Sequence, residues 1–573
     1  GRTSRVLHRE TDAARVARNR DAIVDLHAGA LRWLEDYTAI PYPFGRFDVL
    51  LVPAFQFGGM EHPGAVFYNA PAMLLDESAT QNQHLERAST IAHETAHMWF
   101  GDLVTMRWFD DVWMKEVFAN FMAAKIVNPA FPDVNHDLRF LFAHYPAAYD
   151  VDRTEGTNAI RQPLDNLEDA GQLYGPMIYM KAPILFRQLE QLCGDQVMRE
   201  WLGRYLRRHA CANASWTDLR ALFADRPDLD MGRWSADWID TAGRPTCHVV
   251  VRSEGGRIAD AEVVVRDRAG LGRTWPQRLH VTLGWPTHCR VVPVDVGSAR
   301  VPVPGVAGEP TPAFVLPDGS GRGYGLFQLD ERSIDALLER VETLEPSTLR
   351  GVAWLTLWDN MLEHRVEPAL LLKALVRALA VETHEHLVQR LLAWTVRLFW
   401  RFLSHAERAL AVPSLEARLR NGLALASSSR ARAMWFVSYR DVCCSAEGIA
   451  WLARVWEDTV PVPGLELSEE DLGSLAMHLA IRDLPDADDV VRRQLDRTSN
   501  PDDRARLAFV APAAARDPVT RGRAFDRLLD ANNRRRESWV IESLTYLNHP
   551  LRQDDARRFL RPGLECLPEI QRT

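Results

Sequence analysis

The sequence lacks any pair of cysteines in the CxxC spacing that thiolate zinc sites and dithiol redox sites use. Its seven cysteines are irregularly spaced, and an odd number cannot be fully paired. The adjacent Cys443 and Cys444 cannot easily bridge to each other, because a disulfide requires a specific geometry. We therefore expect free thiols that pack as small hydrophobic side chains, and no cysteine zinc site is supported.

Long apolar runs and an excess of positive charge are also missing. No run of about eighteen apolar residues occurs, and the stretch 370–381 is interrupted by Lys373 and Arg377, so we expect no membrane-spanning helix. The formal net charge of -9 argues against nucleic acid as a partner, because phosphate binding needs a basic surface. Lysine is scarce, and the lysines are Lys115, Lys125, Lys181 and Lys373. We infer no function from this bias.

The length of 573 residues exceeds what one hydrophobic core supports, so a multidomain protein is expected. Residues 12–37 have helical apolar spacing, and the short apolar stretch 47–52 predicts a buried strand. Helical patterns then dominate to about residue 240, strand-length runs follow, and helical periodicity returns to the end of the sequence. The glycine-rich stretch 319–325 does not satisfy GxGxxG and is interpreted as a loop.

These patterns predict a multidomain α+β fold. We expect a catalytic domain over 1–243, a small β-sandwich over 244–330 and an α-helical solenoid over 331–573. Because the sequence begins without methionine or an apolar signal region, we expect residue 1 not to be the start of the gene product, and the sequence to be a fragment.

The strongest chemical signal is HETAH, residues 93–97. His93 and His97 are four residues apart, which places both imidazoles on one face of a helix at a spacing that can share one tetrahedral zinc ion. Glu94 lies beside that face and is available as a base. A motif this short also arises by chance, so it needs support from elsewhere in the sequence.

Glu116 supplies that support. Eighteen residues, 98–115, separate it from His97, and it lies in an apparent second helix that ends before Pro129. A helix hairpin can return its carboxylate to the metal as the third ligand. Three protein ligands leave one position open, which is the arrangement of a catalytic zinc site. We therefore predict one Zn²⁺ per chain, held by His93, His97 and Glu116.

The segment HETAHMWFGDLVTMRWFDDVWMKE, residues 93–116, resembles the HExxH, eighteen residues, E signature of gluzincin aminopeptidases of the aminopeptidase N type, a family that includes leukotriene A4 hydrolase. GGMEH, residues 58–62, resembles the family's GxMEN exopeptidase motif. The resemblance implies a thermolysin-like catalytic domain that removes N-terminal residues from peptides.

The resemblance also implies roles for single residues. Glu94 would act as the general base, and Glu61 would bind the free α-amine of a peptide. The backbone of Gly58, Gly59 and Met60 would align that peptide as an added strand. Tyr179, in a context similar to the family's YxKG, would stabilise the oxyanion, with Tyr174 the weaker alternative and a packing role for Tyr179 left open. Asn120 and Asp111 are candidates to orient a ligand histidine.

The sequence departs from the family pattern at four positions. His62 stands where asparagine is usual, Lys115 where asparagine precedes the glutamate ligand, Val117 where glycine follows it, and Ala182 where YxKG ends in glycine. In the family, an N-terminal β-rich domain contributes a further amine-binding glutamate, and we expect this sequence to lack that domain.

Two other functions remain as alternatives. One is an epoxide hydrolase like leukotriene A4 hydrolase, against which the predicted β-sandwich argues. The other is a non-catalytic, peptide-binding scaffold on a vestigial peptidase fold, against which the intact ligands and base argue. The protein is expected to be soluble, with cytoplasm and periplasm both reasonable, and neither the oligomeric state nor the preferred N-terminal residue follows from the sequence.

Overall fold

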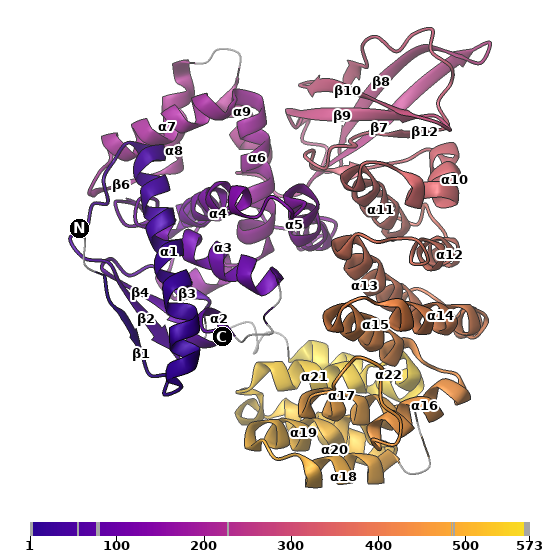
Figure 1. Ribbon diagram of the computed structural model, residues 1–573. Helices are drawn as coiled ribbons and strands as arrows, with labels where there is room; N and C mark the ends of the chain where they lie inside the picture. Colours follow the sequence, from indigo (N-terminus) through magenta and orange to yellow (C-terminus); the bar gives the residue numbers. More distant parts are fainter. Residues whose placement is uncertain are drawn as a thin grey trace. The chain divides into compact units, whose positions relative to one another are not determined.

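The computed structural model describes residues 4–566 except 54, 56, 76–78, 80, 226–228, 483, 485 and 486. The fold is mixed α+β, as predicted (Figure 1). The chain divides into two compact units, Gly1–Val366 and Glu367–Thr573. The predicted boundaries at 243 and 330 both lie within the first unit, between helices and strands. The three-domain division stays a prediction.

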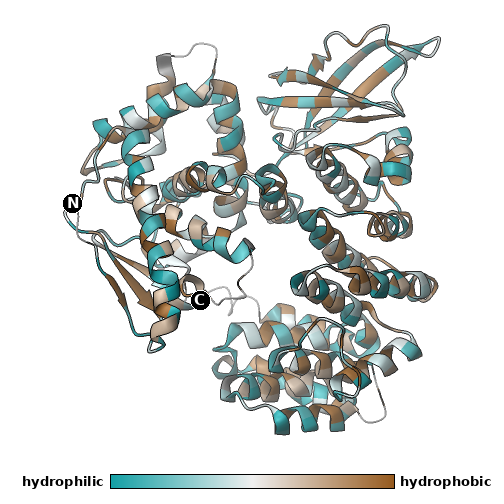
Figure 2. Ribbon diagram, viewed as in Figure 1, coloured by the Kyte–Doolittle hydropathy of each residue, from teal (hydrophilic) through white to brown (hydrophobic). Residues whose placement is uncertain are grey.

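The first unit begins with a small sheet beside a long helix. The helix α1 (Ala13–Thr38) starts at Asp12, whose side chain accepts hydrogen bonds from two backbone N–H groups of the first turn. The sheet has the order β1-β2-β4-β3, in which β3 pairs antiparallel with β4 at one edge. Its strands are β1 (Val6–His8), β2 (Asp48–Val52), β3 (Gly59–Met60) and β4 (Ala65–Asn69). The predicted helix over 12–37 and strand over 47–52 are therefore confirmed. Hydrophobic residues lie along β2 and β4 (Figure 2).

Two helices behind this sheet bring the HETAH motif and Glu116 together. They are α3 (Gln81–His97) and α4 (Trp113–Val127). Ala88 and Ala92 of α3 belong to one buried cluster with Ala123 of α4. Small side chains at these positions let the helix backbones approach closely, which positions the side chains at the ends of the two helices. The predicted helix hairpin is thus present.

The remainder of the first 243 residues is mainly helical. The short elements around the hairpin are α2 (Ala70–Met73), β5 (Val104–Met106), η1 (Phe109–Asp111) and η2 (Asn128–Ala130). The following elements are α5 (His136–Asp152), η3 (Leu167–Leu173), the π-helical turn η4 (Met177–Lys181), α6 (Ala182–Cys193), α7 (Asp195–Arg208), β6 (Ala212–Ala214), α8 (Trp216–Ala221), η5 (Leu222–Asp225) and α9 (Met231–Trp238).

Two sheets follow, with the orders β10-β9-β12 and β11-β8-β7-β13. Their strands are β7 (Pro245–Glu254), β8 (Arg257–Asp267), β9 (Gln277–Gly284), β10 (Cys289–Val296), β11 (Arg300–Pro302), β12 (Phe314–Leu316) and β13 (Leu326–Phe327). The first unit ends with α10 (Glu331–Arg340), η6 (Val341–Thr343) and α11 (Ser347–Leu362).

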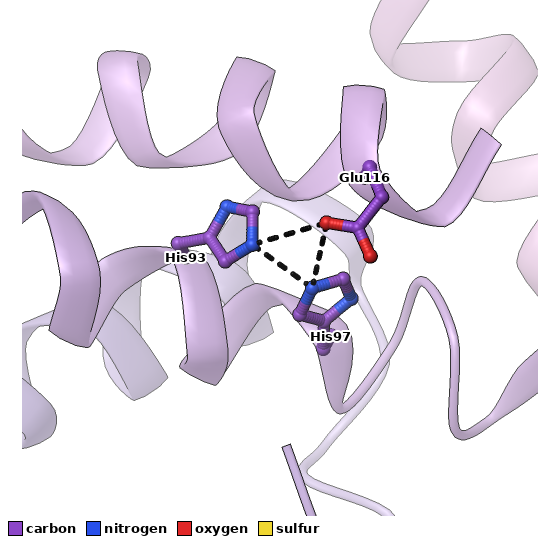
Figure 3. Close-up of side chains that lie close together, drawn as sticks. All are labelled: His93, His97 and Glu116. Atoms are coloured by element: carbon purple, nitrogen blue, oxygen red, sulfur yellow. Dashed lines mark hydrogen bonds and ion pairs between the residues drawn. The ribbon is translucent and has the colours of Figure 1, made fainter. Parts of the chain in front are cut away.

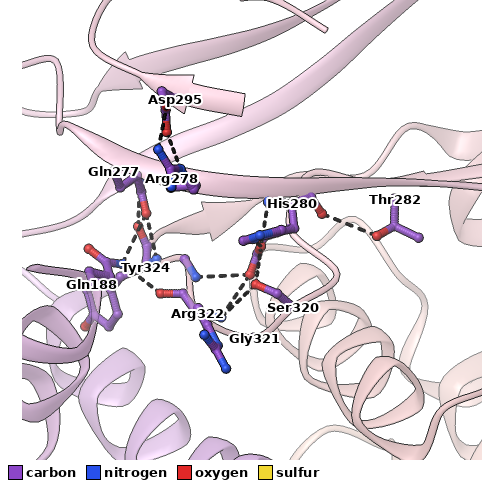
Figure 4. Close-up of polar contacts among 12 residues, drawn as sticks. Gln188, Gln277, Arg278, His280, Thr282, Asp295, Ser320, Gly321, Arg322 and Tyr324 are labelled. Carbon is purple, nitrogen blue, oxygen red and sulfur yellow. Dashed lines mark hydrogen bonds and ion pairs between the residues drawn. The ribbon is translucent and has the colours of Figure 1, made fainter. Parts of the chain in front are cut away.

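The glycine-rich stretch 319–325 is a loop, as predicted, and it is held by polar side chains (Figure 4). Asp318 accepts hydrogen bonds from Ser320 Oγ and from the backbone N–H of Gly323. Gln188 of α6 donates to the carbonyl oxygen of Arg322 at 3.0 Å and to Gln277 Oε1 of β9 at 3.2 Å. This loop therefore joins α6 to the strands.

The second unit consists of helices in its described part, and neighbouring pairs such as α14 with α15 and α17 with α18 contact each other. Whether they form a regular solenoid stays a prediction. No helix among the described residues of the chain is long and apolar enough to cross a membrane. The elements of the unit are α12 (Pro368–Ala378), α13 (Glu385–Arg401), α14 (His405–Leu425), α15 (Ser429–Val442), α16 (Ala446–Trp456), α17 (Glu469–Ala480), α18 (Ala487–Arg497), α19 (Pro501–Ala514), α20 (Pro518–Leu529), η7 (Ala531–Arg534), α21 (Glu537–Leu547), η8 (Pro550–Arg552) and α22 (Gln553–Glu565).

Candidate metal centre

The side chains of His93, His97 and Glu116 converge on one point between α3 and α4 (Figure 3). The two Nε2 atoms are 3.1 Å apart, and Glu116 Oε2 lies 3.5 Å from His93 Nε2 and 3.8 Å from His97 Nε2. His97 and Glu116 are buried, and His93 is partly exposed. The structure thus brings together the three residues that the spacing in the sequence singled out.

The other ring nitrogens of the two histidines already have partners. His97 Nδ1 donates to the backbone carbonyl oxygen of Phe100 at 3.1 Å. His93 Nδ1 lies 3.1 Å from Asn120 Oδ1, one turn beyond Glu116 on α4. A proton on each Nδ1 leaves a lone pair on each Nε2, and metal-binding histidines are usually oriented by such outer hydrogen bonds. Asn120 therefore has the orienting position that the sequence suggested for it.

This donor set fits a divalent cation. Two Nε2 lone pairs and a carboxylate oxygen facing each other at 3.1–3.8 Å repel unless a cation lies between them. Two imidazoles and one carboxylate are a common protein ligand set of catalytic zinc. Burial and the neighbouring His93 lower the pKa of His97 to about 4, so this imidazole is neutral near pH 7. The residues present thus match what zinc requires.

Glu94 points into the same region from the next position of α3. Its side chain is buried, and an oxygen of Glu94, an oxygen of Glu61 and a ring nitrogen of His97 all lie within 4.8 Å of one another. Burial, together with the negative charges of Glu61 and Glu116, raises the pKa of Glu94 to about 7, despite the opposing effect of His93 and Lys115. A carboxyl group with a pKa near neutrality is suited to accept and return a proton.

The strand β3 packs directly on Glu94. A Cβ atom at position 59 would overlap the Oε1, Cδ and Cγ atoms of the Glu94 side chain. Any residue other than glycine at position 59 would therefore force the Glu94 side chain to move. At position 58 a Cβ would meet nothing nearer than Thr90 Cγ2 at 3.8 Å, which is an ordinary contact. A side chain would thus fit at Gly58, whereas at Gly59 it would overlap Glu94.

Glu61 directly follows β3, the edge strand of its sheet, and it faces the metal centre. Its carboxylate Oε1 lies 2.5 Å from Lys115 Nζ, and the same ammonium lies 3.0 Å from Glu116 Oε1. Lys115 therefore bridges the predicted amine-binding carboxylate and a predicted metal ligand. The sequence alone did not reveal this ion pair, because Lys115 stood out only as a lysine where asparagine usually precedes the glutamate ligand. The one hint in the sequence was that a lysine, which is scarce in this chain, directly precedes the predicted ligand Glu116.

Tyr179, in η4, and Tyr174, directly after η3, lie close enough to interact with the charges of Glu61, Lys115 and Glu116. Their rings stack with centroids 6.2 Å apart. Burial, with the nearby negative charge of Glu116, raises the pKa of Tyr179. The phenol therefore stays protonated and can donate a hydrogen bond. Tyr179 belongs to the π-helical turn η4, a geometry that is frequent at functional sites and that the sequence did not reveal.

Asp111, the other candidate for orienting a histidine, does something else. Its carboxylate accepts from Arg161 Nε at 2.7 Å and from the backbone N–H of Trp216 at 3.0 Å. It therefore joins η1 to the start of α8. The interpretation of Asp111 as a partner of a ligand histidine is wrong, because both of its oxygens are engaged away from the imidazoles.

Comparison with known proteins gives a consistent result. Residues 23–238 match the peptidase family M1 domain. An aminopeptidase N of Streptomyces lividans is 25% identical over 476 residues, which is 80% of this chain and 55% of that protein. A probable aminopeptidase 1 of Sulfurisphaera tokodaii is 31% identical over 231 residues, and a leucyl aminopeptidase of Saccharolobus solfataricus is 30% identical over 228 residues. These two matches each cover 40% of this chain and 29% of the relative.

The chain thus spans about half or less of the length of these curated relatives. The matched region contains both motifs and all residues of the metal centre described above. Residues 23–238 of this chain therefore form a peptidase family M1 domain.

Proposed function

We propose that the chain is a zinc-dependent aminopeptidase, which hydrolyses the N-terminal peptide bond of peptides with a free amino terminus. The observation that carries this proposal is the convergence of two imidazole Nε2 atoms and one carboxylate oxygen, with Glu94 buried beside them. The names of the relatives, aminopeptidase N and leucyl aminopeptidase, support the same reaction class.

Zinc held by His93, His97 and Glu116 would polarise the scissile carbonyl and acidify water in the site. Glu94 accepts the proton of the attacking water on its carboxylate and later delivers it to the leaving amine. The phenol of Tyr179 donates a hydrogen bond to the oxyanion that develops on the carbonyl oxygen. Its raised pKa supports this role, because a protonated phenol is needed.

Substrate alignment uses the edge of the small sheet. Among the described strands, β3 pairs with β4 only, so we expect its other side to accept a peptide as an added strand. Glu61, at the end of this strand, receives the α-ammonium group. A carboxylate in this position fixes the distance from the amino terminus to the scissile bond, so that one amino acid is released per turnover.

The direct test is hydrolysis of aminoacyl p-nitroanilides by the zinc-loaded chain, with and without chelator. We expect turnover that chelation abolishes and added zinc restores. Substitution Glu94→Gln should lower kcat by about 10²- to 10⁴-fold, the usual contribution of a general base, while zinc content is unchanged. Glu86→Gln, an exposed residue on the same helix, is the matched control.

A zinc-loaded chain that folds but hydrolyses no aminoacyl anilide would contradict the proposal. That result would favour a non-catalytic, peptide-binding protein instead. Equal activity of Glu94→Gln and the unmodified chain would contradict the assigned base while leaving the metal site intact.

A further inference from the structure

The ammonium group of Lys115 pairs with Glu61, the carboxylate proposed to bind the α-ammonium group of a peptide. Its Nζ atom is 2.5 Å from Glu61 Oε1 and 3.0 Å from Glu116 Oε1. The side chains of Lys115 and Glu61 are 18% and 15% exposed, so the ion pair is mostly withdrawn from water. Ion pairs with little solvent access are screened less than surface pairs.

This position is set by the backbone. Lys115 precedes Glu116 in the first turn of α4, and Glu61 directly follows β3. Both residues of the ion pair therefore lie on segments that border the candidate metal centre. The contact needs no movement of a loop. The lysines are few in this chain, yet one of them stands at this point between two carboxylates.

We propose that Lys115 is a specificity-determining residue whose ammonium group already neutralises Glu61, so that the site gains little from the α-ammonium group of a substrate. This inference rests on the proposed function, in which Glu61 faces the amino terminus of a peptide. An incoming ammonium must share Glu61 with Lys115 and lies close to a like charge, and like charges oppose each other strongly where water is scarce. The free amine therefore aligns a peptide on Glu61 but adds little to its affinity.

The test compares two ligands that differ only in the amine, leucine and 4-methylpentanoate. Their dissociation constants are measured by calorimetry on the zinc-loaded full chain, so the result does not depend on turnover. We expect the unmodified chain to bind the two ligands within about threefold of each other. Lys115→Met should bind leucine about tenfold more tightly, because Glu61 is freed, and should leave the affinity for 4-methylpentanoate unchanged.

Three further variants separate this effect from a structural one. Lys115→Arg keeps the positive charge and should behave as the unmodified chain does. The double variant Lys115→Met with Glu61→Gln should lose the gain in leucine affinity. Lys125→Met, on the same helix, removes an ammonium that pairs with Glu190 and Asp195 instead, and should change neither affinity.

The proposal is overturned if the unmodified chain already prefers leucine by tenfold or more, or if Lys115→Met, folded and zinc-loaded, binds leucine no more tightly than before. Hydrolysis of leucine p-nitroanilide is followed in parallel. Absence of hydrolysis in all variants would count against the aminopeptidase proposal alone, because the ratio of the two ligand affinities still decides the role of Lys115.

Discussion

Position 59 of the candidate site requires glycine for a steric reason. Its backbone conformation is one that other residues adopt, but a Cβ atom there would overlap the buried Glu94 side chain. The motif at 58–62 is therefore tied to the general base as well as to a substrate. A sequence pattern alone cannot show this, because the two residues are far apart in the chain.

We expect Gly59→Ala to lower kcat by about tenfold or more, because Glu94 must move away from the water it serves and misplacement of a catalytic group is costly. Gly58→Ala is the control, since its Cβ has room, and it should retain most of the activity. Steady-state kinetics with a p-nitroanilide and zinc analysis of both variants check this. Equal losses in the two variants would mean that the strand, not the contact with Glu94, is disturbed.

At the scale of elements, the pair α3 and α4 carries the candidate metal centre, and α4 also orients a predicted ligand of α3. Asn120 of α4 accepts the hydrogen bond from His93 of α3. Asn120→Ala should weaken zinc binding by about 10- to 100-fold, the usual effect of losing such an outer partner. Competition with a calibrated chelator measures it. Unchanged affinity would show that His93 is held by packing alone.

The helix α1 makes the stability of the first unit depend on pH. His27 is buried, its Nδ1–H donates to the carbonyl oxygen of Ile23 at 2.7 Å, and its Nε2 accepts from the hydroxyl of Tyr68 on β4 at 3.0 Å. Burial lowers the pKa of His27 from 6.5 to about 4. The unfolded chain therefore takes up a proton at His27 below pH 6.5 that the folded chain refuses until about pH 4.

The free energy of unfolding is thus complete above pH 6.5 and falls as pH decreases toward 4. His27 alone should remove about 2 kcal/mol between pH 7 and pH 5. Urea unfolding at the two pH values checks this, with His27→Gln as comparison, because glutamine does not titrate. The difference between the two pH values should be smaller by that amount in the variant. An identical difference in both proteins would contradict the assignment.

Elements with a strong local signal were predictable from the sequence. The apolar period predicted α1 and β2. The spacing of HETAH and Glu116 predicted that these three side chains converge, because the two histidines share one face of a helix and a helix hairpin returns the glutamate to them. The contacts that the sequence did not reveal join distant segments. The Lys115–Glu61 ion pair, the π-helical turn at Tyr179 and the engagement of Asp111 by Arg161 all depend on tertiary packing.

At the scale of the whole molecule, the strands β7–β13 belong with the M1 domain in one unit because buried polar contacts join them. Arg244, which precedes β7, forms a two-pronged ion pair with Asp359 of α11 at 2.8 and 2.9 Å. Lys181, at the end of η4, pairs with Asp152 at 2.7 Å, and Tyr324 donates to the same carboxylate. Removing one partner of such a buried pair leaves an uncompensated charge, so these contacts hold the strands to the helices of the same unit.

These same contacts link the site to the rest of its unit. Lys181 lies two residues after Tyr179 and is fully buried, so it anchors the turn that presents the phenol. The placement of Tyr179 therefore depends on Asp152 of α5 and on Tyr324 in the loop before β13. That loop lies beyond the region that the family domain covers. Local motifs predict the metal ligands, and contacts from the rest of the unit hold the other groups of the candidate site in place.

The central claim is that His93, His97 and Glu116 hold one zinc ion per chain. Elemental analysis of the purified chain after incubation with zinc and removal of excess metal tests it most directly. We expect one zinc per chain, and much less than one in the folded variants His97→Ala and Glu116→Ala. A folded chain that stays free of zinc, or variants that keep the full amount, would contradict it.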